Sequence, residues 1–416
     1  MSEERKISKK EWAWTIAFLL GMKLIYFLIF AYSHHYLPRA RYPAELWMTK
    51  PETTLLENLA NFDGAWFVRI AWLGYERLTK GDYDLKEAIK RIKVIDRLGY
   101  EDGVQRKFAY RHWPFFPWLI KYLGILLQGR YLVAGVIISN LFYFLYGISF
   151  YLLAREYFSH STSLLALAFA LIHPGAYSLT AIYNEPVFLF LICTCFYSLK
   201  KDKYFLAGVF GALASLCRIE AVLVYVPIIY EFFRKRVEPE DGFWAPFYKK
   251  NFFSSFSRLW REPRVLWLFL VPFGSVLVLA YFKLISGNAF IFVQVHEANI
   301  YGHFGFPWQM LYATYLKGPD TYLKEFPLHA LLLLIIIFGW RKVDYTVWLW
   351  MVSFWLFYTT NGNHSYLRYQ VMCVPMFLSL ARLLETKDVL KYFYMIASAG
   401  AMSFFSAMFI NGYWVA

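Results

Sequence analysis

Eleven stretches of this chain are built almost wholly from apolar residues, and the first, WAWTIAFLLGMKLIYFLIFAY, covers residues 12–32. A helix of about 20 apolar residues is long enough to cross the hydrocarbon core of a bilayer. Because helices satisfy their own backbone hydrogen bonds, such stretches become helices in lipid. The sequence therefore predicts an all-α, polytopic membrane protein with about eleven transmembrane helices. The ten further predicted spans cover residues 131–153, 161–180, 186–199, 205–217, 219–233, 265–285, 328–339, 345–360, 369–383 and 389–410.

The composition agrees with a membrane protein, since 59% of the 416 residues are hydrophobic and only 17% are charged. The basic start and the first apolar run are compatible with a signal peptide. The run lacks a small-residue cleavage pattern, however, which favours a retained first helix. All four cysteines fall in apolar segments. We interpret them as small buried residues and not as a disulfide framework or a metal site.

The net charge of +14 raises the question of a nucleic-acid partner, and the positions of the charges answer it. With the N-terminus inside, the inner segments contain the clusters KKDK, RKR and KK, whereas the short outer loops contain few cations. This asymmetry follows the positive-inside rule, so the charge encodes topology and predicts no nucleic-acid partner. The C-terminus is then outside. The cations of the short outer loops are Arg218, Lys317, Lys324 and Arg368.

The predicted topology forms a single domain, residues 1–416, with three long connections between its spans. Residues 33–130 make a long first outer loop containing interfacial helices, residues 234–264 a basic cytoplasmic loop, and residues 286–327 a second outer loop. A charged insert at residues 79–107 fits either an amphipathic helix on the membrane or a solvated insertion. The sequence contains no internal repeat, phosphate loop or HExxH motif, which argues against an inverted-repeat transporter and a cytosolic nucleotide substrate.

The same topology gathers scattered ionisable residues at the outer face of the protein. Ionisable side chains near the ends of membrane spans are costly, and they mark functional sites. We therefore expect them to line one outer cavity, covered by the two outer loops. The residues are Asp63, Glu185, Arg218, His296, Glu297, His303, His364 and Arg368.

The stretch NFDGAWFVRIAWLGY, residues 61–75, sets a lone acid among aromatic and apolar neighbours. A short helix over Ala65–Leu73, ended by Gly74, is apolar nearly all round and is expected to lie in the membrane interface. Asp63 is then an N-cap of that helix, a base at headgroup depth, or both. Desolvation at that depth predicts a raised pKa for Asp63, which would make it a better base.

Several segments resemble the PIG-V family, the GPI mannosyltransferase II family of GT-C glycosyltransferases. FDGAWFVRIAWLGYE resembles the family's W-D-x-x-x-F-x-x-I-A-x-x-G-Y segment, and HWPFFPWLIKYL takes the place of its A-F-F-P-x-Y-P stretch. LTAIYNEPVFLFL is similar to the Tyr-x-Glu segment, GALASLCRIEAVLVYVP to the small-residue run ending in Arg, and SGNAFIFVQVHE to the G-D-P-x-A-F outer loop. LRYQVMCVPMFLSLAR resembles the late R-Y span. The similarity runs through nearly the full length in the right order.

The chain also departs from the family's pattern. Phe62 replaces the usual Trp, the second Pro after PFFP is missing, and Asn288 stands where the family tends to have Asp. The charged insert separates the first two family segments. These departures leave the acceptor more open than the class of reaction.

The resemblance implies a GT-C fold and a membrane glycosyltransferase. Such enzymes transfer a sugar, with inversion, from a dolichyl or polyprenyl phosphate to an acceptor in or beside the membrane. The reaction takes place on the outer or lumenal face, mannose is the family's usual sugar, and the family's acceptor is a GPI-precursor glycolipid. Asp63 matches the family's candidate catalytic base by position and context. We predict no cofactor, and a divalent metal ion is left open.

The leaving phosphate gains negative charge during such a transfer, and preorganised cations stabilise that charge. Arg368 is our first choice for this role, because guanidinium binds phosphate bidentately. Arg218 is the second choice, with a snorkelling side chain at a helix end as its alternative. Glu185, at the start of a span, either complements the helix dipole or binds hydroxyls of the substrate.

Three further residues are candidates for binding substrate. His296 and Glu297 are expected to bind hydroxyls or to pack, because His303, seven residues later, gives poor spacing for metal ligands. Trp113 either stacks on a sugar or belongs to the aromatic belt of the membrane interface.

Two other classes of function compete with a glycosyltransferase. A transporter or flippase of a lipid-linked sugar would use the outer polar cluster as a vestibule, and it should show polar groups on both sides. A structural membrane subunit would have no need of concentrated acids and bases. The predicted partners are a dolichyl- or polyprenyl-phosphate sugar, a membrane-bound acceptor and the bilayer itself. The location is the plasma membrane in a prokaryote or the endoplasmic reticulum membrane in a eukaryote.

Overall fold

The computed structural model consists of helices joined by loops, and all regular elements of its described part are α- or 3₁₀-helices. Four of these helices are long and apolar enough to cross a membrane, and five shorter ones are also apolar. These helices are consistent with an integral, polytopic membrane protein. The described residues are 7–40, 54–80, 107–234, 242–245, 248, 263–297, 305–316, 319–360 and 365–415.

Helical structure covers each of the predicted spans. The agreement is closest at α17 (Tyr345–Thr360), which has the predicted bounds; α10 (Tyr204–Cys217) and α20 (Asp388–Ile410) are one residue longer than predicted, and α7 (Tyr131–Arg155) is two residues longer. The other elements in these spans are α1 (Lys9–Tyr36), α8 (His160–Leu171), η2 (Pro174–Leu179), α9 (Glu185–Lys200), η3 (Ile219–Val224), α11 (Tyr225–Arg234), η6 (Pro263–Phe269), α13 (Leu270–Ser286), α16 (Pro319–Gly339), α18 (Tyr366–Gln370) and α19 (Val374–Leu384).

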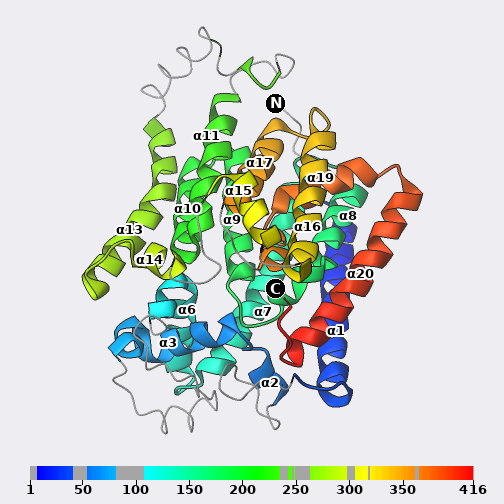
Figure 1. Cartoon of the computed structure of the whole chain (residues 1–416). Helices are drawn as coiled ribbons and strands as arrows, with labels where there is room; N and C mark the ends of the chain where they lie inside the picture. The colour runs from blue at the N-terminus through cyan, green and yellow to red at the C-terminus, as the bar shows by residue number, and fades with distance from the viewer. Residues whose placement is uncertain are drawn as a thin grey trace.

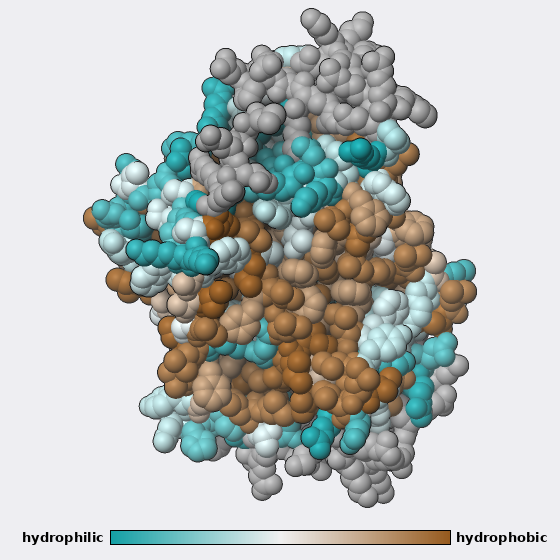
Figure 2. Space-filling view, turned by 180° about the vertical axis from the view of Figure 1, so that it is seen from behind, coloured by the Kyte–Doolittle hydropathy of each residue, from teal (hydrophilic) through white to brown (hydrophobic). Residues whose placement is uncertain are grey.

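The helices form one bundle with an apolar middle. Figure 1 shows α1, α7, α9, α17, α19 and α20 running alongside one another, while α2 and α3 lie across one end of the bundle. From behind, Figure 2 shows a broad apolar band around the middle, with hydrophilic residues toward both ends. This distribution is what a bilayer requires of a protein that it surrounds.

Elements of the predicted first outer loop cover the end of the bundle at the bottom of Figure 1. They are α2 (Leu55–Asn58), α3 (Asp63–Lys80), η1 (Lys107–Arg111) and α6 (Phe115–Leu126). Gly74 adopts φ 75° and ψ 166° and interrupts α3, as the sequence predicts for the end of a short helix. The charged insert lies almost wholly outside the described residues. The described part of the second outer loop contains α14 (Ile291–Glu297) and α15 (Pro307–Leu316).

The spans near this end are broken into shorter pieces, and the breaks follow from the sequence. The predicted span 161–180 divides into α8 and η2, because Pro174 has no backbone N–H to continue the helix. The span 369–383 likewise divides into α18 and α19, with Pro375 in the first turn of α19. Irregular backbone at membrane depth occurs where it is buried in protein or lines a cavity. These breaks therefore mark the covered end of the bundle as the place to look for a buried polar site.

Helix α20 holds the site-bearing loop in place. The amide of Asn61 donates to the Phe409 carbonyl (2.9 Å), and the amide of Asn411 donates to the Ser33 carbonyl (3.1 Å). The ring of Phe62 packs against the Phe409 ring, with centroids 6.0 Å apart. Residues just before α3 are thus fixed by the end of a helix more than 300 positions later.

A second group of charges, which we did not predict from the sequence, lies at the opposite end of the bundle. Lys200 Nζ lies 2.8 Å from Glu231 Oε1, and Arg234 Nη1 lies 2.8 Å from Asp344 Oδ2. Lys200 Nζ is also 3.7 Å from Asp344, and Glu231 accepts a hydrogen bond from Thr346. Charged groups therefore occur at both ends, contrary to the expectation that they collect at one. Here two cations face two carboxylates, so the group is balanced and ties α9 and α11 to the start of α17.

Candidate active site

Asp63 begins α3 at the covered end of the bundle. The preceding residue, Phe62, has φ 58°, a conformation that L-residues seldom adopt. The next residue is glycine, and a Cβ there would lie 3.0 Å from the Ile182 carbonyl oxygen. The turn into α3 is therefore strained and tightly packed against the segment before α9. Such a turn aims the Asp63 carboxylate into the bundle, with 23% of the side chain exposed.

The Asp63 carboxylate pairs with Arg368, at a separation of 305 positions in the chain. Arg368 Nη1 lies 2.7 Å from Asp63 Oδ2. Arg368 Nε lies 3.2 Å from Glu185 Oε1, and its Nη2 donates to the hydroxyl of Tyr369 at 3.0 Å. Each nitrogen of this guanidinium therefore faces an oxygen. The three residues predicted from α3, α9 and the start of the late span meet at one point.

Arg218 extends this group of charges on the far side of Glu185. Its Nη1 lies 3.4 Å from Glu185 Oε1 and donates to the side-chain oxygen of Asn184 at 2.7 Å. Its Nη2 lies 2.8 Å from Glu220, which also accepts a hydrogen bond from Tyr358 at 2.7 Å. Arg218 is therefore a largely buried, paired side chain and does not snorkel. We call Asp63, Glu185, Arg218, Glu220 and Arg368 the site cluster.

Aromatic faces hold the two guanidiniums. Arg368 lies over the rings of Tyr183 and Tyr369, with its central carbon 5.0 and 4.8 Å from their centroids. Arg218 lies 5.2 Å from the Tyr369 centroid. Cation–π contacts of this kind strengthen when water is excluded. They keep both cations in the dry setting where charge stabilisation is strongest.

His112 completes the surroundings of Asp63. Its Nε2 lies 3.7 Å from Asp63 Oδ1, on the side of the carboxylate that Arg368 leaves open. The imidazole stacks on Trp66 and meets the edge of Phe67, and the hydroxyl of Tyr75 donates to its backbone carbonyl. Within the described residues, Nδ1 is buried without a hydrogen-bond partner. Nε2 is the ring nitrogen that faces the carboxylate, so we assign a proton to it.

The surroundings lower the pKa of Asp63 below its usual range. Burial acts to raise it, but the charge of Arg368 and the contact with His112 act more strongly in the opposite direction. Our sequence-based expectation of a raised pKa is therefore wrong for this state of the protein. Sequence reasoning foresaw the desolvation but not the cation that faces the carboxylate.

Exposure separates the three carboxylates of the site cluster. The side chain of Asp63 is 23% exposed, that of Glu220 11%, and that of Glu185 is fully buried. Asp63 is accordingly the carboxylate that an incoming acceptor can reach. Glu185 Oε2 has no hydrogen-bond partner within the described ranges, so it is available to a hydroxyl that enters the site.

The structure places the other predicted residues differently. Trp113 is 4% exposed, and its ring packs edge-on against Phe292 in a second apolar cluster, which favours packing over sugar stacking. His296 is buried at the end of α14, which packs against η1. The side chain of Glu297 is outside the described part of the structure, as are His303 and His364.

Sequence reasoning missed two residues of the site. Glu220 lies in IEAVLV, directly after Arg218, and an acid two residues from a predicted phosphate-binding arginine was an available signal. His112 precedes Trp113, which had been chosen for its ring. Nothing in the sequence shows that the loop brings this histidine back to Asp63.

No disulfide or ready metal site emerges from the described residues. All four cysteines are free and buried, as predicted. Within the described ranges, no three His, Cys, Asp or Glu side chains converge as ligands for a metal ion.

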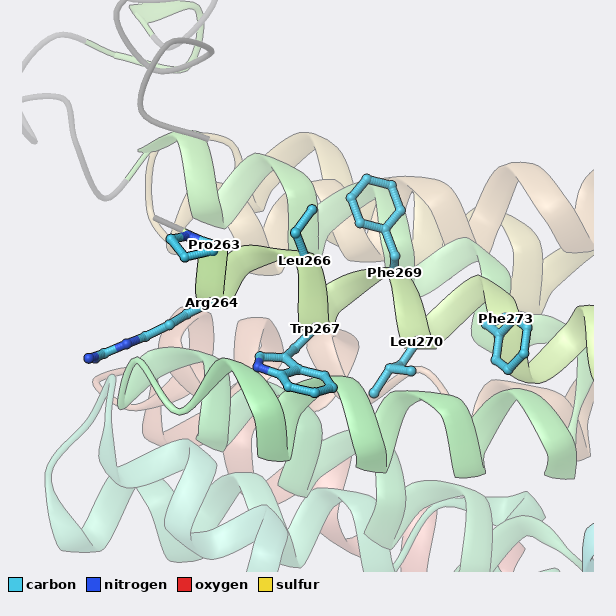
Figure 3. A pocket seen from close by; sticks show the side chains of 7 residues that line it. All are labelled: Pro263, Arg264, Leu266, Trp267, Phe269, Leu270 and Phe273. Carbon is cyan, nitrogen blue, oxygen red and sulfur yellow. The ribbon is translucent and has the colours of Figure 1, made fainter. Parts of the chain in front are cut away.

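An apolar hollow on the surface lies away from the site cluster. Figure 3 shows it along η6 and the start of α13, lined by Trp267, Leu270 and Phe273, with Arg264 extending outward at one end. Trp267 packs against Phe205 at the start of α10, the end of the bundle opposite to Asp63. Its exposed apolar lining suits contact with lipid and lacks the carboxylates that the predicted chemistry needs.

Comparison with protein families supports a glycosyltransferase. Residues 111–236 match the family model described as dolichyl-phosphate-mannose-protein mannosyltransferase. The match supports the GT-C superfamily, and it indicates a membrane glycosyltransferase of the polyprenyl-phosphate-mannose type; it does not single out the PIG-V family. The matched segment contains His112, Glu185, Arg218 and Glu220, whereas Asp63 and Arg368 lie outside it. No curated protein matches the chain.

Proposed function

We propose that this protein transfers mannose, with inversion, from a dolichyl- or polyprenyl-phosphate mannose to a membrane-bound acceptor. The observation that carries the proposal is the ion pair between Asp63 and Arg368 at one end of an apolar bundle. It joins a reachable carboxylate to a buried guanidinium, the two groups that a base and a phosphate-binding residue require. The family match supports the donor class.

The proposed reaction assigns a role to each member of the site cluster. Asp63 takes the proton from the acceptor hydroxyl as its oxygen attacks C1 of the sugar. The bond between C1 and the phosphate oxygen breaks, and its electron pair goes to that oxygen. The donor leaves as a polyprenyl phosphate monoester, whose added charge Arg368 stabilises and Arg218 supports from behind Glu185. Glu185 accepts a hydrogen bond from a hydroxyl of the bound sugar or acceptor.

The resemblance to the PIG-V family suggests a glycolipid acceptor of the GPI-precursor type on the outer or lumenal face. The position of Asp63 agrees with an acceptor in or beside the membrane. Its helix, α3, lies across the end of the bundle at the bottom of Figure 1. An acceptor anchored in lipid would approach the carboxylate from that end.

The test is release of polyprenyl phosphate by the purified protein in nanodiscs, from polyprenyl-phosphate mannose and an extracted glycolipid acceptor. Asp63→Asn should lower the transfer rate on the order of 10²–10⁴-fold, as expected for loss of a general base. Glu57→Gln is the matched control, because Glu57 lies in the same loop but caps α2 through Thr54. Transfer by Asp63→Asn at the wild-type rate, or no release by any form, would refute the proposal.

A further inference from the structure

The ion pair between Asp63 and Arg368 blocks the arrangement that the proposed reaction requires. In an inverting displacement, the attacking oxygen, C1 and the leaving oxygen lie roughly in line. The attacking oxygen sits about 3–3.5 Å from C1 before reaction. A base beside the attacking oxygen and a cation beside the leaving phosphate are then separated by the sugar. With 2.7 Å between Asp63 Oδ2 and Arg368 Nη1, no sugar fits between them.

The contacts of Arg368 indicate which partner moves. Asp63 faces Nη1, Glu185 faces Nε, and the Tyr369 hydroxyl accepts a hydrogen bond from Nη2. The guanidinium has five N–H groups, so these three contacts leave donors for a phosphate. A phosphate bound next to the sugar nevertheless needs the space that one of the two carboxylates now occupies. Glu185 is fully buried and is also held by Arg218, whereas Asp63 is the more exposed partner.

We propose that the donor phosphate displaces Asp63 from Arg368, so that binding of the donor creates the catalytic base. This inference rests on the proposed function. In the state seen here, Asp63 occupies the place of the phosphate on Arg368. When the phosphate takes that place, the carboxylate is released toward the acceptor.

His112 is positioned to retain Asp63 after this exchange. It faces Oδ1, while Arg368 faces Oδ2, so the contact with His112 does not depend on the arginine. Its ring is fixed by Trp66 and Phe67 on the same helix as Asp63. Release from Arg368 also removes the charge that does most to lower the pKa of the Asp63 carboxylate. The other titratable groups that face Asp63 are His112, Glu185 and the hydroxyls of Tyr177 and Tyr183. The base thus gains proton affinity only once a donor is bound.

The exchange predicts that removal of the catalytic carboxylate tightens binding of the phosphate. We would measure binding of a short-chain polyprenyl monophosphate to the full-length protein in nanodiscs. Asp63→Asn and Asp63→Ala should both bind it about 10-fold more tightly than wild type, since a competing charge-assisted hydrogen bond is lost. The corresponding polyprenyl alcohol should bind all forms equally, because it carries no phosphate.

A double variant localises the effect to Arg368. If the gain arises there, Asp63→Asn combined with Arg368→Met, which has no cation to compete for, should bind no more tightly than Arg368→Met alone. Equal or weaker binding by both Asp63 variants, with wild type binding the monophosphate, would overturn the exchange and leave the proposed function standing. Absence of binding by every form would overturn both.

Discussion

The most demanding prediction concerns the guanidinium of Arg368 and uses a substitution that keeps its charge. Arg368→Lys replaces three directed nitrogen positions by one ammonium. Of the contacts to Asp63, Glu185 and Tyr369, a lysine can keep one carboxylate. It loses the charge-assisted hydrogen bond to the Tyr369 hydroxyl, about 1.5–3 kcal/mol, and the directed contact between Nε and Glu185. The folded state should therefore weaken by at least about 1.5–3 kcal/mol at this buried position.

The effect on turnover should be separable from this loss of stability. Without a fork of N–H groups, the ammonium gives the leaving phosphate one fewer bond when its charge grows. Loss of one such donor in a preorganised site costs on the order of 10²–10³ in rate. Turnover should be measured on variant protein shown to be folded, below its thermal midpoint. Arg368→Met should be worse in both respects, because it leaves Asp63 without its arginine and Glu185 with Arg218 alone.

Arg382→Lys is the matched control for this experiment. Arg382 pairs with Glu385 at the other end of the bundle and is 49% exposed. An exposed pair of this kind contributes about 0–1 kcal/mol, so its replacement should leave both thermal midpoint and turnover near wild type. If Arg368→Lys behaves like Arg382→Lys, the bidentate role of Arg368 is wrong, and Arg218 becomes the residue to test.

Three further predictions address the packing, the orientation and the ionisation of the site. Gly175→Ala should destabilise the protein by about 1–3 kcal/mol and reduce turnover, because the new Cβ would lie 2.4 Å from the Leu367 carbonyl oxygen beside Arg368. Gly400→Ala is its control, because a Cβ there meets nothing within 4 Å. Equal thermal midpoints of the two variants would contradict the close approach. His112→Phe should lower kcat strongly and leave the KM for the donor nearly unchanged. His112→Gln, which retains an N–H near Nε2, should recover part of kcat. Equal kcat values for the two variants would show that the N–H has no role in orienting Asp63. Because folding lowers the pKa of Asp63, the stability from its ionised form is fully present above the unfolded pKa of about 3.9 and is lost as pH falls through the folded pKa. The gap in thermal midpoint between wild type and Asp63→Asn should then be constant between about pH 5 and 8 and narrow only below about pH 4, and a gap that closes near neutrality would contradict the ion pair.

The fold was largely predictable because the bilayer imposes a simple rule on the sequence. Apolar runs of sufficient length gave the bounds of α17 and nearly those of α7. The break between α8 and η2 was missed, since the run at 161–180 is apolar on both sides of Pro174. The proline itself was the available signal. The span count rests on helices of very different length, of which four meet the length and composition of a crossing helix.

The site was predictable where topology alone decides it. Asp63, Glu185, Arg218 and Arg368 were placed at one end of the bundle by the alternation of spans, and their side chains meet there. Which charges pair could not be predicted, because pairing depends on how helices rotate against one another. For this reason the predicted direction of the Asp63 pKa shift was wrong. The ion pairs of Lys200 with Glu231 and of Arg234 with Asp344 were not predicted either.

The hold of α20 on the loop before α3 has a consequence for the time at which the enzyme becomes active. Asn61 and Phe409, which hydrogen-bond to each other, are 348 positions apart. At about 5–20 residues per second, the ribosome takes about 17–70 s to make the chain between them. For most of that interval the turn before Asp63 lacks the Phe409 carbonyl that holds it. Arg368, the partner of Asp63, is synthesised only near the end of the interval. A nascent chain therefore contains its proposed base well before it can use it, and the proposed transfer begins only when α20 has joined the bundle.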